Sequence, residues 1–159
     1  MKRLARSILG VTLLEVMLVL AIAAMIIVMS IRYYQSASAN QQANGFLAQI
    51  QSIVAAAEQM AQATGSYANA VGGSGINTSN LAPLLPANSF TTPWGASISM
   101  GTPTASAFQL TVSTIPASVC QIVYSKLSTN NHFSGSGTAA AALPTCTTSG
   151  WNFFYISNP

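Results

Sequence analysis

The chain has 159 residues with a formal net charge of +3, and charged residues make up 4% of it, against about 25% in an ordinary soluble domain. Three of its five bases lie in the first six residues, and there is no aspartate. The rest of the chain therefore lacks the clustered lysines and arginines of a nucleic-acid-binding surface. The length fits one domain with a membrane element.

The first predicted elements are a basic head, residues 1–10, and an apolar segment, residues 11–31. The segment is long enough to cross a bilayer as a helix. Because the three bases of the head precede it, we expect the N-terminus in the cytoplasm and the rest of the chain outside. Glu15 is the only charged side chain of this segment.

The helix is predicted to continue well beyond the apolar segment. No proline occurs in the first eighty residues, and apolar residues recur every three or four positions as far as Ala61, with glutamines on the opposite face. We predict one helix from about Val11 to Ala63. Its half at residues 11–32 is predicted to span the membrane, and its half at residues 33–64 to be amphipathic.

Residues 65–159 are predicted to form a small globular head. A loop rich in Gly, Ser, Asn and Pro comes first, at residues 65–93, with a helical turn possible around Asn80–Leu85. Period-two patterns then predict strands, and a proline at a helix-start position predicts a short helix. The fold class is α+β, with an antiparallel sheet packed on the amphipathic half of the long helix. The predicted strands are Ala96–Met100, Phe108–Ser113 and Trp151–Ile156, and the short helix after Pro116 carries Cys120.

The two cysteines, Cys120 and Cys146, leave two interpretations open. A single pair in a chain with a membrane signal favours a disulfide formed in an oxidising compartment. The alternative is two buried free thiols. A metal site is not expected, because two Cys and one His without aspartate do not supply four ligands at the usual spacing.

The residues do not predict an enzyme or a cofactor. Serine and threonine are abundant, but no base lies at triad spacing. The single histidine, His132, lies in the polar segment STNNHFSGSG and is predicted to be an exposed loop residue without a function. The aromatic run at residues 151–155 is predicted to be a core strand.

Three interpretations compete for the N-terminal segment. A secretory signal peptide has a basic head, an apolar stretch and a small-x-small cleavage site, here Ala21–Ala23, but a carboxylate in its apolar region argues against it. A plain signal anchor leaves Glu15 unexplained, since an acidic residue in a spanning helix is costly and usually functional.

The third interpretation starts from Gly10. The basic head, Gly10 and the sequence GVTLLEVMLVLAIAA, with Glu15 five residues on, resemble the N-terminal signature of type IV pilins. The resemblance implies that a prepilin peptidase cuts between Gly10 and Val11 and methylates the new amino terminus at Val11. It also implies a role for Glu15 in assembly.

The resemblance extends along the chain to type IVb pilins, of the bundle-forming pilus and conjugative thin-pilus type. RYYQSAS at residues 32–38, TPWG at 92–95 and IPASVC at 115–120 are similar to stretches of those pilins. Val11 in place of phenylalanine agrees with type IVb. The 10-residue leader and the short mature chain depart from that group and are nearer type IVa.

Membership of this family implies a filament subunit for adhesion, aggregation or conjugative mating. The implied partners are copies of itself, the peptidase, an assembly platform with its ATPase, and a secretin. The implied location is the inner membrane before assembly and an extracellular pilus afterwards. A minor pilin or type II secretion pseudopilin is the alternative, and a membrane-anchored periplasmic binding module is the second.

The resemblance also gives Glu15 a physical role. Cleavage after Gly10 creates an amine at Val11, with a reference pKa of about 7.7–8.0. A carboxylate and an ammonium are each costly in an apolar medium, and least so when paired. We therefore expect Glu15 to face the terminal amine of a neighbouring copy and to set the register of assembly.

Overall fold

The computed structural model describes residues 12–70, 73–137 and 141–158. The chain divides into two compact units, Met1–Ala37 and Ser38–Pro159. Gly10 and Val11, at the predicted cleavage point, lie outside the described residues.

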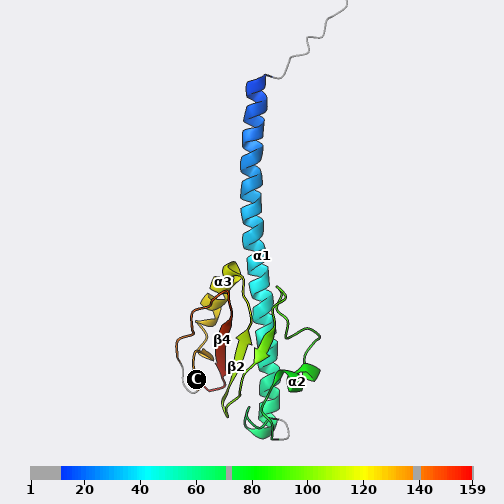
Figure 1. The fold of residues 1–159 in the computed structure, drawn as a ribbon, viewed down its shortest axis with the longest axis vertical. Helices are drawn as coiled ribbons and strands as arrows, with labels where there is room; N and C mark the ends of the chain where they lie inside the picture. The colour runs from blue at the N-terminus through cyan, green and yellow to red at the C-terminus, as the bar shows by residue number, and fades with distance from the viewer. Residues whose placement is uncertain (1–11, 71–72, 138–140, 159) are drawn as a thin grey trace, which may run out of the picture. The chain divides into compact units, whose positions relative to one another are not determined.

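The long helix predicted from the sequence is present as α1, Leu13–Thr64 (Figure 1). At its start, the N–H of Glu15 donates to the carbonyl oxygen of Thr12 at 3.0 Å and to the side-chain oxygen of Thr12 at 3.3 Å, as a capping threonine does in the first turn of a helix. At its end, Gly65 adopts a positive φ of 72°, the conformation that commonly terminates a helix and that glycine adopts without strain.

The second unit contains a four-stranded antiparallel sheet in the order β1-β2-β4-β3. Its two central strands are among those predicted, and they run side by side in Figure 1. Strand β1 begins two residues later than predicted, and the short strand β3 was not predicted. The strands are β1 (Ile98–Met100), β2 (Ala107–Val112), β3 (Phe133–Ser134) and β4 (Trp151–Ile156).

Short helices flank this sheet. The turn expected near residue 80 is present as α2, Thr78–Leu81, followed by the 3-10 helix η1, Ala82–Leu84. Asn77 caps α2 by accepting from the N–H of Asn80 at 2.9 Å, as a short amide side chain does at a helix start. The helix predicted after Pro116 is α3, Ala117–Leu127.

The core of the second unit lies between the amphipathic half of α1, α3 and the inward face of the sheet. Strand β4 alternates strictly over its first three residues, with Trp151 and Phe153 buried and Asn152 exposed, as a half-buried strand requires. The α+β fold with a long helix packed on a small antiparallel sheet is therefore confirmed. The fully buried side chains include Phe46, Ile50, Ile53, Phe108, Leu110, Val119, Val123 and Phe153.

A loop closes over α1 at a glycine. The ring of Trp94 packs against Phe46 with centroids 5.1 Å apart, and its indole N–H donates to the carbonyl of Thr114 at 2.7 Å. A Cβ on Gly45 would lie 3.3 Å from the ring of Pro93. Glycine at this point of the helix thus allows the loop to approach closely, which offsets its low helix propensity.

Candidate assembly site

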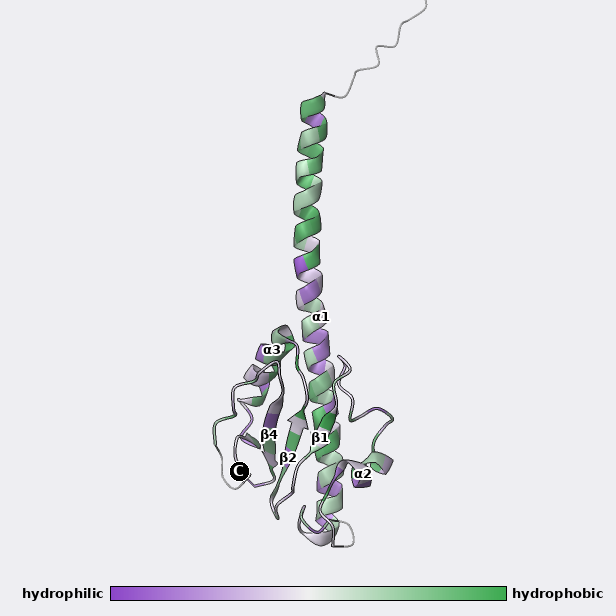
Figure 2. Ribbon diagram, viewed as in Figure 1, coloured by the Kyte–Doolittle hydropathy of each residue, from purple (hydrophilic) through white to green (hydrophobic). Residues whose placement is uncertain are grey.

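The first half of α1 exposes its apolar side chains. From Leu13, 76% exposed, to Ile31, 52% exposed, the large side chains lie open on all sides of the helix. Figure 2 shows this half as almost continuously hydrophobic, whereas the half beside the sheet mixes both kinds of residue. A helix that is apolar all round needs lipid or other protein around it.

Helix α1 is long and apolar enough to cross a membrane, and it is the one such helix among the described residues. Its apolar window is not buried inside the protein, so it is not the core helix of a soluble domain. The basic head, residues 1–10, lies outside the described residues, and the orientation stays a prediction.

Glu15 lies in the first turn of α1, on an exposed stretch of the helix. A carboxylate in this position interacts favourably with the partial positive charge of the helix N-terminus. Beyond this, the described residues give Glu15 no cationic neighbour. Its proposed partner is the amine of residue 11 in another copy, which the single chain does not show.

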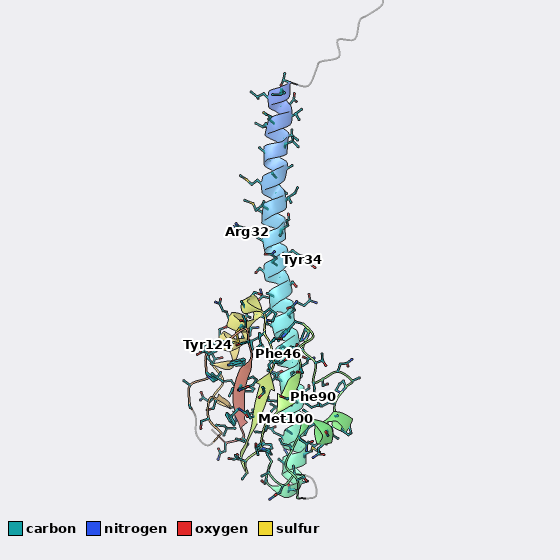
Figure 3. The ribbon with its side chains drawn as sticks, viewed as in Figure 1. Arg32, Tyr34, Phe46, Phe90, Met100 and Tyr124 are labelled. Atoms are coloured by element: carbon teal, nitrogen blue, oxygen red, sulfur yellow. A yellow bond between two sulfur atoms is a disulfide. The ribbon has the colours of Figure 1, made fainter. Side chains whose placement is uncertain are left out.

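The apolar segment ends in a basic and aromatic group. Arg32 and Tyr34 project from α1 in Figure 3, and the rings of Tyr33 and Tyr34 are 79% and 74% exposed. Tyrosine and arginine at the end of an apolar helix are typical of the membrane–water interface. After residue 10 the sequence has only two Lys or Arg residues, Arg32 and Lys126.

The second acid, Glu58, lies on the amphipathic half of α1 and accepts a hydrogen bond from the hydroxyl of Tyr155 on β4. Burial, followed by this hydrogen bond and the charge of Glu58, raises the pKa of Tyr155. Burial and then the same charge raise the pKa of Tyr67. Both pKa shifts have the same sign because burial, and then the negative charge of Glu58, disfavours the ionised form of each hydroxyl.

His132 corrects one sequence prediction. It was expected to be exposed, but it is half-buried, with its ring stacked on Tyr155 at 5.6 Å between centroids. Its Nδ1 lies 2.8 Å from the carbonyl oxygen of Ile156, so Nδ1 carries the proton and donates. The short strand β3, which starts at the next residue, pairs with β4 and holds the histidine there. The polar and glycine-rich sequence around His132 predicts a loop, and it does not indicate that β3 pairs with β4.

A groove of about 450 Å³ runs between α1 and the segment that links α3 to β3. The α1 wall is mixed: it carries Leu47, Gln51 and Ala55, together with the buried Ile50 and Val54. Polar groups from both sides also line it, among them Glu58, Lys126 and His132. The ammonium of Lys126 donates to the side-chain oxygen of Asn44 at 2.7 Å.

The two cysteines form a disulfide, which confirms one of the two interpretations. Cys120 on α3 and Cys146 have their Cα atoms 5.8 Å apart and are separated by 26 positions. The bridge ties α3 to the segment before β4, where the indole N–H of Trp151 donates to the carbonyl of Pro144 at 2.9 Å. No group of three metal-ligating side chains lies together within the described ranges.

Comparison with known proteins identifies one matching family model. A family model described as Bundlin matches residues 35–152, which covers nearly all of the second unit and most of the chain. No curated protein and no solved structure matches the chain.

Proposed function

The chain belongs to the bundlin family, the pilin subunits of the bundle-forming pilus, and from this membership we propose that it polymerises through the apolar half of α1 once residues 1–10 have been removed. The family is one of type IVb pilins, structural subunits rather than enzymes. It does not favour a minor pilin, a secretion pseudopilin or a membrane-anchored binding module.

The observation that carries the proposal is the exposure of the apolar half of α1. Side chains such as Leu18, Ile26 and Met29 are 57–63% exposed in a single copy. Outside the bilayer, apolar surface left in water would cost about 25 cal/mol per Å², so copies extracted from the membrane would stay together by bundling these segments. Before assembly the same segment would lie in the inner membrane, with the head outside.

Glu15 would fix the axial position of each helix relative to its neighbours in the bundle. Cleavage between Gly10 and Val11 would place a methylated amine near the start of each helix. Two charges in an apolar filament core are tolerable only as a pair. A subunit placed out of register would leave both charges unpaired, so Glu15 would select the correct position rather than add net stability.

The remaining partners are proposed from membership of the family. A prepilin peptidase would cut and methylate the chain, and an assembly platform with its ATPase would extract the mature subunit from the membrane. A secretin would pass the filament through the outer membrane. The head is nearly free of charge and would be suited to lateral packing in a filament used for adhesion, aggregation or conjugative mating.

Shearing the cells tests the proposal. Electron microscopy of the sheared material should show filaments, and their main protein should be this chain. A strain without the gene is the control. Recovery of the chain only from membranes, with no filaments in the sheared material, would contradict it.

A further inference from the structure

The structure shows a neutral hydrogen-bond donor, and no cation, beside the carboxylate of Glu58 among the described residues. The contact that the structure shows for its carboxylate is the neutral hydroxyl of Tyr155. Lys126 lines the same groove, but its ammonium donates to Asn44. In a filament that covers the groove, a carboxylate without a cationic partner would oppose assembly.

The wall of the groove that α1 provides has a regular spacing. Leu47, Gln51, Ala55 and Glu58 line it at intervals of three or four positions and therefore lie on one face of the helix. Ile50 and Val54 also border the groove, but they are buried in the core, at 1% and 9% exposed. At 1.5 Å per residue, this stripe is about 16 Å long. It begins at the apolar side chain of Leu47 and ends with the carboxylate of Glu58.

The first half of α1 carries a longer apolar stretch, from Leu13 to Ile31, that ends beside Arg32. Residues 21–28, AIAAMIIV, are apolar, and Arg32 follows them, so the distance from Ala21 to Arg32 equals that from Leu47 to Glu58. Three of these residues are alanines, which allow helices to approach closely. Arg32 lies on an exposed part of the helix.

The helices of different copies would be parallel, because every copy enters the membrane in the same orientation. We propose that α1 of a second copy lies along the groove with its Arg32 against Glu58. This rests on the proposed function, since it requires that copies polymerise. In this register Ala21 of one copy is level with Leu47 of the other, and Met25 is level with Gln51.

The chemistry of the two side chains fits such a contact. A guanidinium offers a planar fork of donors that matches a carboxylate. Tyr155 already holds one oxygen of Glu58, which fixes the carboxylate in place. A shift of the second helix by one turn would leave both charges buried and unpaired, so the contact specifies register as well as partner.

A charge exchange tests the pair. Arg32→Glu and Glu58→Arg should each reduce sheared filaments at least tenfold, and the double variant should recover most of the loss. Lys126→Glu is the matched control in the same groove and should have a much smaller effect than either single variant. Membrane levels and N-terminal processing are measured in every strain. A double variant as poor as the single variants would overturn the Arg32–Glu58 contact.

Cross-linking tests the register without depending on charge. Met25→Cys with Gln51→Cys, both at exposed positions, should give covalent dimers and higher ladders in oxidised filaments. Met25→Cys with Gln62→Cys is the matched control, because residue 62 lies on the same face three turns further along, and it should give none.

The cross-linking experiment separates this inference from the proposed function. Wild-type filaments with no cross-link at the first cysteine pair, or an equal cross-link at the control pair, would overturn the inference and leave polymerisation intact. Absence of wild-type filaments would overturn polymerisation, and the inference with it.

Discussion

The hydroxyl of Tyr155 donates to the carboxylate of Glu58 and joins β4 to α1 across 97 positions of sequence. Tyr155 is buried and Glu58 is half-buried. The hydrogen bond therefore lies at the edge of the core, where the last strand meets the long helix. It ties β4, the last strand of the chain, to α1, the helix that carries the proposed assembly surface.

Loss of this hydrogen bond should weaken the head. A hydrogen bond to a charged group is worth about 1.5–3 kcal/mol, and partial exposure of Glu58 lowers that value. Tyr155→Phe should therefore reduce the free energy of unfolding by about 1–2 kcal/mol, measured by urea denaturation of the detergent-solubilised chain. Tyr124→Phe, on α3, is the control, because it also removes one tyrosine hydroxyl but leaves the hydrogen bond to Glu58 in place. Equal effects of the two variants would contradict the role of Tyr155.

Alkaline pH should destabilise the head through the same residue. The pKa of Tyr155 is raised in the folded chain, so above the ordinary pKa of about 10 the unfolded chain loses a proton that the folded chain keeps. The stabilisation is complete below that pH and is lost as pH rises through the folded pKa. The free energy of unfolding should fall by up to about 1.4 kcal/mol per pH unit for each such group.

Tyr155→Phe should remove part of this alkaline slope. The remaining slope should come from Tyr67, whose pKa is also raised. Denaturation series at several pH values between 9 and about 11 provide the comparison. If the free energy of unfolding of the variant fell with pH as steeply as that of the wild type, the raised pKa of Tyr155 would not be the source of the alkaline loss of stability.

The disulfide should contribute strongly to stability. Its 26-position separation corresponds to about 3 kcal/mol of lost entropy in the unfolded chain. Replacing Cys120 and Cys146 together by serine should lower the free energy of unfolding by about that amount. Reduction of the wild-type chain should give the same change, which controls for the substitutions themselves. A difference below about 1 kcal/mol would contradict the loop-closure estimate.

Glu15→Ala should abolish filaments or reduce them sharply while leaving cleavage after Gly10 largely intact. The carboxylate is proposed to pair with a neighbour's amine, whereas the peptidase acts on the bond before Val11. Filaments are counted by electron microscopy, and cleavage is followed by the mobility of the chain. Met17→Ala, on the same exposed turn, is the control. Wild-type numbers of filaments from the Glu15 variant would disprove the pairing.

Much of the fold follows from local patterns in the sequence. The absence of proline and the three-to-four spacing predict α1, and alternation predicts the two central strands, because each of these elements buries one face. The strand β3 is two residues long and depends on pairing with β4. No local pattern reports such a pairing, and the burial of His132 was missed for the same reason.

The candidate site was predictable only in part. A carboxylate at Glu15 in an apolar helix is visible in the sequence because it breaks the composition of its surroundings. Glu58 looks like an ordinary polar residue on an amphipathic helix, and its contact with Tyr155 arises from tertiary packing. The groove beside it requires three separate segments to meet.

We propose that this pilin becomes an assembly subunit only when cleavage after Gly10 supplies the amine that pairs with Glu15. N-terminal sequencing and mass spectrometry of the main protein in sheared filaments test it directly. The account predicts a chain that begins at methylated Val11 and lacks residues 1–10. Filaments built from chains that begin at Met1, or at any residue other than Val11, would contradict it.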